Sequence, residues 1–275
     1  MTEPDGSFAP ALLGTFQDAV DLLEKQVSGI RTAWDEFTRT AEEFLAAIRA
    51  KLQDDHWWNR IAEWFTDDIA DTLEAIEAGI ESARVKLDDI LGRMDAALSG
   101  TPPILSLFRS GIDWSTTINT RLSAIQPDVE QSGSIDVWHG PAHDTYRTRE
   151  TEQGEAVGLA SAQVKSLSVW LADVAEANTH FVTELVDQAT TIVEELVTVT
   201  LDIGTAIGAE DPLSAQEAVN NLDEMMGKYA AAIIDFLTSL ANRFTEVIRL
   251  VTEVAAEHSD NSAFPGGNWP KAVDL

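Results

Sequence analysis

Two histidines, His139 and His143, have the spacing in this sequence that most resembles metal-binding chemistry. Imidazoles four residues apart on a continuous helix share one face, and Asp144 would add a carboxylate beside them. Gly140 and Pro141 intervene, and this pair predicts that His139 lies before the helix that contains His143. No third ligand follows at the spacing of a zinc site. The sequence therefore predicts no metal site and no cofactor, and we interpret the two histidines as solvated or helix-capping residues.

Adjacent acidic residues are the second pattern that could carry chemistry, because paired carboxylates can act as general acid and base. Such pairs occur at Glu42-Glu43, Asp67-Asp68, Asp88-Asp89 and Glu194-Glu195. Catalysis requires burial in a cleft that shifts a carboxyl pKa, whereas acids along a long amphipathic helix are solvated. The sequence contains no serine elbow, Gly-rich phosphate loop or E-x-x-H pattern. We therefore predict that the protein is not an enzyme and has no catalytic residues.

Trp57 and Trp58 form an adjacent aromatic pair in the first turn of a predicted helix, after the capping residues Asp54 and Asp55. Two adjacent side chains on a helix cannot both face one apolar stripe. One alternative is that one indole is exposed at the tip of a helical hairpin, where it meets a partner or a membrane interface. The other is that neighbouring helices cover both.

Composition limits the partners of the chain. The formal net charge is −29, so phosphates of nucleic acid would be repelled and an anionic membrane surface is disfavoured. The chain has no cysteine, which excludes disulfides and thiolate sites. Its N-terminus has neither a basic region nor an apolar run, so no secretory signal peptide is predicted.

Five helical segments are predicted from apolar residues that recur at alternating steps of three and four. Their approximate ranges are 10–53, 54–98, 104–125, 141–207 and 214–258, and residues 259–275 are predicted to be a disordered tail. Short connections predict that the helices run up, down, up, down, up. The fold class is therefore all-α, an elongated antiparallel bundle of about five long helices.

Two of these segments meet at Trp138 and Gly140, where a bulky aromatic and a conformationally free residue mark a turn. This W-x-G turn between amphipathic helices in an acidic, cysteine-free chain resembles the WXG superfamily of type VII (Esx-type) secretion substrates. The resemblance covers about residues 104–200. It implies a W-x-G helical hairpin whose tip, with Tyr146 and Glu150, is recognised by export machinery or by a helical partner protein.

The whole layout is similar to a fused version of the paired PE and PPE secretion substrates. Residues 8–99 would be the two-helix part, and residues 104–258 the W-x-G hairpin with a C-terminal helix. The family's Y-x-x-x-D/E export signal lies near the end of a helical hairpin. Tyr146 and Glu150 keep its spacing but follow the turn directly, and no tyrosine precedes Tyr146. The other interpretation of Tyr146 is that it packs beside Trp138.

The resemblance implies a non-enzymatic secreted substrate or effector scaffold, located outside the cell or on its surface without a cleaved signal peptide. The alternative is a membrane-active, pore-forming-like helical protein, with 185–207 as the inserting segment. That segment carries Asp187, Glu194, Glu195 and Asp202, each costly at a bilayer centre, so membrane contact is not favoured. A third expectation is that the apolar seams drive homo-oligomerisation.

Overall fold

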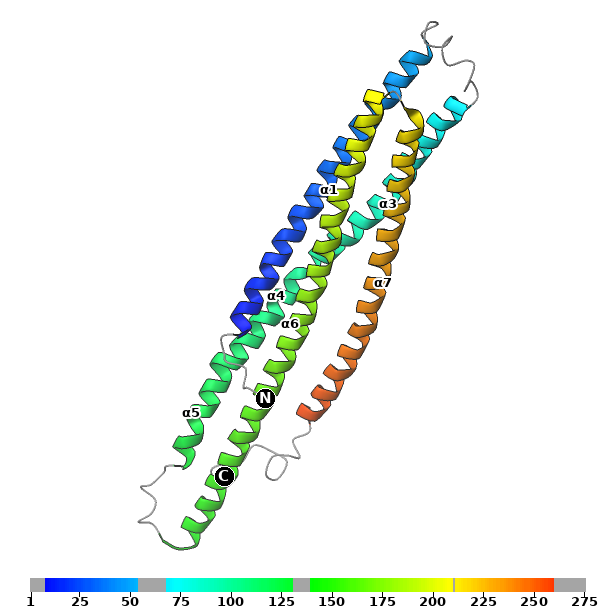
Figure 1. Cartoon of the computed structure of the whole chain (residues 1–275). Helices are drawn as coiled ribbons and strands as arrows, with labels where there is room; N and C mark the ends of the chain where they lie inside the picture. The colour runs from blue at the N-terminus through cyan, green and yellow to red at the C-terminus, as the bar shows by residue number, and fades with distance from the viewer. Residues whose placement is uncertain (1–7, 54–67, 131–138, 210, 260–275) are drawn as a thin grey trace. The chain divides into compact units, whose positions relative to one another are not determined.

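The computed structural model describes residues 8–53, 68–130, 139–209 and 211–259, which are almost entirely helical and contain no strand. The all-α prediction is therefore confirmed. Figure 1 traces the elements in chain order: α1 (Phe8–Leu52), α3 (Asp68–Ser99), α4 (Thr101–Asp113), the π-helical turn η1 (Trp114–Ile118), α5 (Asn119–Glu130), α6 (Pro141–Ala209) and α7 (Pro212–Ser259).

The chain divides into two compact units. Unit 1 comprises Met1–Phe16, Pro102–Thr179 and Ala241–Leu275, and unit 2 comprises Gln17–Thr101 and His180–Leu240. Each unit draws on several segments, so α1, α6 and α7 contribute residues to both. The predicted division of the sequence at residues 99–104 stays a prediction.

In unit 2, two helical hairpins pack together, and pairwise contacts give the helix directions. Arg31 of α1 pairs with Asp95 of α3 at 2.7 Å, and Arg49 further along α1 pairs with Glu77 earlier in α3, so α1 and α3 are antiparallel. α6 and α7 are also antiparallel, because Phe181 stacks on Phe236 at 4.9 Å while Tyr229 lies near Glu195.

The two hairpins meet through parallel neighbours. Gly79 of α3 lies against Val219 of α7, and Lys86 further along α3 binds Asp223 further along α7 at 2.6 Å. α1 lies beside α6, with Gly29 against Val193 (Figure 1). Unit 2 is therefore a four-helix arrangement. α1 is antiparallel to α3 and α6 is antiparallel to α7, whereas α1 is parallel to α6 and α3 is parallel to α7.

Predicted apolar seams fill the interior of unit 2. α1 buries most of its predicted series, and so do the described parts of α3 and α6. The fully buried side chains with the largest volumes include Phe37, Phe44, Ile30, Ile48, Ile76, Leu87, Ile90, Met94, Leu185 and Ile192. These predictions are confirmed, because spacing of three and four places a helical stripe on the packed face.

The half-buried Lys86–Asp223 pair joins α3 to α7 within unit 2. Lys86 Nζ also donates to the backbone oxygen of Asp223 at 3.1 Å. Burial raises the pKa of the Asp223 carboxyl, but hydrogen bonds from Lys86 and Ser82 and the charge of Lys86 outweigh it, so the pKa is lowered. The carboxylate is therefore held in its charged form.

The predicted strict alternation of helix directions is wrong, because it requires α3 and α7 to be antiparallel and they run parallel within unit 2. Gly100 lies at the end of α3. This residue alone separates α3 from α4, and its amide donates to the carbonyls of Ala96 at 3.2 Å and Ala97 at 3.1 Å. Thr101 Oγ1 donates to the Leu98 carbonyl at 2.9 Å. The carbonyls of Ala96, Ala97 and Leu98 at the end of α3 thus all accept hydrogen bonds from Gly100 or Thr101. α4 therefore begins one residue after Gly100 closes α3, although the sequence there is Gly-Thr-Pro-Pro.

The third predicted segment also differs from the structure. It is predicted to end at residue 125, but α5 continues to Glu130, because Pro127, near the helix end, removes one hydrogen bond without stopping the last turn. Within the segment, Phe108 is buried and Ile125 is 45% exposed.

The start of α7 corrects another prediction. The segment is predicted to begin at Ser214, but Pro212 is the first residue of the helix and Asp211 caps it. Asp211 Oδ1 accepts from the Leu213 and Ser214 amides at 3.1 and 3.3 Å, and Ser214 Oγ donates to Oδ2 at 2.6 Å. The Ser214 hydroxyl and these amides lower the pKa of Asp211.

In unit 1, α4 and α5 pack antiparallel to the first part of α6. Gly111 lies against Leu171, and Ser161 Oγ donates to Asn119 Oδ1 at 2.7 Å. The midpoint between residues 111 and 171 is residue 141, and that between 119 and 161 is residue 140. The register of the two arms is therefore centred on Gly140.

We predict that Gly79→Ala destabilises the protein. An alanine Cβ would lie 2.6 Å from Val219 Cγ1, and Val219 is fully buried. Such overpacking costs about 1–3 kcal/mol. The matched control is Gly92→Ala in the same helix, where nothing lies within 4 Å of the new Cβ. It should stabilise by up to about 1 kcal/mol through helix propensity. Thermal unfolding followed by circular dichroism measures both, and an equal rise in Tm for both variants would contradict the close α3–α7 contact.

Candidate functional site

The backbone of Gly140 is the most unusual feature of the predicted site. Its φ is +112°, a conformation that strains any residue with an L side chain. Nothing lies within 4 Å of where a Cβ would stand, so backbone conformation alone selects glycine here. Gly140 therefore uses the conformational freedom that its residue type gives, and the W-x-G hairpin stays a prediction.

α6 begins directly after this glycine. Pro141 is its first residue, and the Asp144 amide donates to the Gly140 carbonyl at 3.2 Å as the first helical bond. Proline suits this position because its missing N–H would have no partner there. Thr145 and Thr148 fold their hydroxyls onto the Pro141 and Asp144 carbonyls, each at 3.0 Å. Gly140 and Pro141 therefore define the residue at which the long helix α6 begins.

The two histidines flank the turn, as their spacing predicted. Their ring centroids are 6.4 Å apart, and His143 Nδ1 lies 3.1 Å from Asp144 Oδ1. Asp144 is largely exposed, with a side-chain exposure of 81%. Among the described residues, no group of three or more histidines and acids is placed to hold a metal ion.

Tyr146 and Glu150 lie four residues apart on α6, so they share one face of the helix. Arg147 Nη1 donates to Glu150 Oε2 at 2.7 Å, and the Glu150 side chain is only 10% exposed. Tyr146 is half-buried. The carboxylate of the predicted recognition pair is therefore held by a guanidinium and largely covered.

A second pair, Arg149 with Glu152 at 2.9 Å, follows in the same turn of helix. Both guanidiniums are thus engaged by acids three residues further on, which is the favourable spacing on a helix. Between residues 139 and 165 the sequence has three Lys and Arg against four Asp and Glu, so this segment is nearly neutral in a chain of net charge −29.

The tryptophans of the predicted site, Trp57, Trp58 and Trp138, lie outside the described residues. Their predicted roles stay predictions.

Sequence reasoning missed the π-helical turn at Trp114–Ile118 in the arm opposite α6. The Asn119 amide closes it by bonding to the Trp114 carbonyl, and the Asn119 side chain accepts from Ser161. Such turns add a residue to a helix and are frequent at functional sites. No residue type in this segment signals one.

Comparison with known proteins found no matching family model, no matching curated protein and no matching solved structure. In the described part of the chain, no helix combines the length and the apolar character needed to cross a bilayer. Within the segment 185–207, Leu185, Ile192, Leu196 and Ile203 are buried in unit 2.

We predict that Gly140→Ala lowers the free energy of unfolding by about 1–3 kcal/mol, because alanine must adopt a strained positive φ. Gly158→Ala in α6 is the matched control, since its new Cβ also meets nothing within 4 Å and its φ lies outside the positive range. The control should stabilise by up to about 1 kcal/mol. Urea unfolding of both variants measures the difference. A Gly140→Ala protein as stable as the control would show that the positive φ is not retained in solution.

Proposed function

We propose that this chain is a non-enzymatic helical protein exported by a type VII (Esx-type) secretion system. It acts as a secreted substrate or effector scaffold through helix–helix contacts. Its place of action is outside the cell or on the cell surface, reached without a cleaved signal peptide. Trp138 and Gly140 form the tip of a W-x-G helical hairpin that the secretion machinery or a helical partner recognises.

The observation that carries this proposal is the conformation of Gly140. The glycine of the W-x-G tripeptide is the residue with positive φ, it directly precedes α6, and the register of the two arms is centred on it. A chance W-x-G inside a helix would have none of these features. Trp138 precedes this glycine by two residues in the sequence.

Tyr146 and Glu150 extend the proposed recognition site along the first turns of α6. Their spacing matches the Y-x-x-x-E form of the export signal, and they lie on one face of the helix. The ion pair between Arg147 and Glu150 fixes the acidic member of the pair. The proposal assigns Trp57 and Trp58, which lie between α1 and α3 in the sequence, to a second exposed contact site.

The proposal predicts that Trp138→Ala abolishes export from a bacterial host with an active type VII system. Removing the indole takes away the largest apolar surface at the tip, where aromatic anchors dominate recognition. Export is measured by immunoblot of culture supernatant against cell lysate, and the wild-type chain must depend on the secretion ATPase of the host.

Trp34→Ala is the control for loss of an indole, because Trp34 is half-buried in unit 2 and contacts Phe37 at 5.1 Å. Circular dichroism of both purified variants verifies that they are folded. We expect the control to be exported and Trp138→Ala to stay in the cells. Equal export of the two variants would refute a recognition role for Trp138, and export without the ATPase would refute the type VII route.

A further inference from the structure

The outward face of α6 in unit 2 carries an apolar stripe that no part of the described chain covers. It consists of Val197, Leu201, Gly204 and Gly208, whose spacing of four, three and four puts them on one face. Val197 is 48% exposed and Leu201 is 66% exposed, the highest value among the large exposed hydrophobic residues of the described chain. We call these residues the α6 outer stripe.

The two glycines of the stripe pack against none of the residues that the structure describes. A Cβ at Gly204 or Gly208 would meet nothing within 4 Å, whereas one at Gly79 would meet Val219 at 2.6 Å. Glycine inside a helix weakens it relative to alanine. Its benefit is that a second backbone can approach closely, and at Gly204 and Gly208 none of the residues that the structure describes supplies that second backbone.

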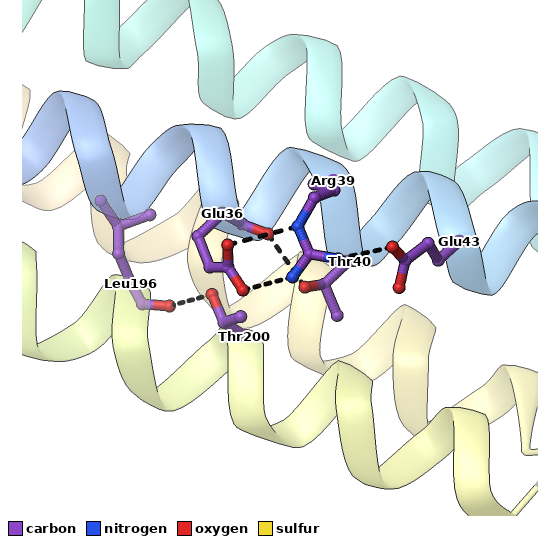
Figure 2. A network of polar contacts seen from close by, with 6 residues as sticks. All are labelled: Glu36, Arg39, Thr40, Glu43, Leu196 and Thr200. Atoms are coloured by element: carbon purple, nitrogen blue, oxygen red, sulfur yellow. Dashed lines mark hydrogen bonds and ion pairs between the residues drawn. The ribbon is translucent and has the colours of Figure 1, made fainter.

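Acidic side chains border the stripe on both sides. Glu194 and Asp202 are exposed on α6 itself. On the neighbouring helix α1, Glu36 and Glu43 are exposed and hold Arg39 between them, so its charge is neutralised. Figure 2 shows this group above Thr200 of α6, which lies beside the stripe.

The wider charge pattern identifies the kind of partner. Residues 166–227 contain 12 Asp and Glu and no Lys or Arg. A second copy of this chain, docked through the same face, would bring like charges together, and an anionic lipid surface would do the same. A partner with an apolar stripe between basic side chains would contact the α6 outer stripe and also pair with the acidic side chains beside it.

We propose that the α6 outer stripe is a docking face for an amphipathic helix of another protein, with a small or aliphatic stripe flanked by Lys or Arg. The glycines admit its backbone, Val197 and Leu201 cover its apolar stripe, and the acids on α6 and α1 pair with its basic flanks. This face lies in unit 2, away in sequence from the turn at Gly140, so the proposal does not depend on the route of export.

The test uses the full chain and helix-stabilised peptides of about 20 residues, because shorter isolated helices are marginal in water. The first peptide carries a Leu and Ala stripe flanked by Lys. The second carries the same stripe flanked by Glu, and the third has the composition of the first in scrambled order. Fluorescence anisotropy measures Kd for each, at low and at physiological salt.

We expect the Lys-flanked peptide to bind and the other two to bind at least about tenfold more weakly. Val197→Asn with Leu201→Asn should weaken binding by about tenfold or more, since both aliphatic contacts are lost without a change of charge. Leu22→Asn with Val85→Asn is the matched control, because these residues are exposed by 41% and 58% on α1 and α3. The control should bind like the wild-type chain.

Gly204→Ala separates docking from helix stability. It should raise Tm through helix propensity and yet weaken binding, whereas Gly92→Ala should raise Tm and leave binding unchanged. Equal binding of the scrambled peptide, or equal binding by all variants, would overturn the proposal in favour of unspecific attraction to an acidic protein. Self-association in sedimentation velocity that Val197→Asn with Leu201→Asn abolishes would overturn it in favour of a second copy.

Discussion

Burial of apolar side chains between α1, α3, α6 and α7 is the interaction on which unit 2 depends. Each aliphatic or aromatic residue that leaves water there contributes about 1.5–3 kcal/mol. Within unit 2 the buried seam of α1 is continuous from Val20 to Ile48. This continuity fixes the helices lengthwise and sets which residues face outward. The Lys86–Asp223 pair and the close contact at Gly79 depend on this burial, because both form only when α3 and α7 are already packed together.

The sequence was sufficient to predict which face of each long helix is buried in unit 2, since a stripe repeating every three or four residues must face its neighbours. It was insufficient for neighbour directions. The parallel packing of α3 on α7 depends on how the segments between them connect, and the apolar repeat within a helix does not specify this. At Gly100, for example, a Gly-Thr-Pro-Pro sequence leaves only one residue between α3 and α4. Ile125, which belongs to the apolar repeat of its helix, is nevertheless 45% exposed. Periodicity predicts which face of a helix is apolar, but it does not predict how many neighbouring helices cover that face.

At the candidate site, Gly140 and Pro141 were predictable because their chemistry is local. A residue without a side chain adopts the positive φ, and a residue without an N–H starts the helix. Asp211 was equally predictable as a helix cap, because it is an acid followed by proline. The predicted start at Ser214 is too late because Ser214 and Glu217 also have the spacing of a helix start. The covering of Glu150 and its bond to Arg147 was not predictable, since it depends on the rotamers of side chains three residues apart.

The chain contains no cysteine, so two can be introduced without background. Spin labels at exposed Thr120 and Ala162 test whether the chain reverses at Gly140 more directly than any other measurement. Pulsed electron paramagnetic resonance should give a short distance for this pair. A second pair, Thr120 with Glu176, should give a distance longer by up to about 20 Å, the rise of 14 helical residues. Equal distances for the two pairs, or a longer one for Thr120 with Ala162, would contradict an antiparallel pair of arms centred on Gly140.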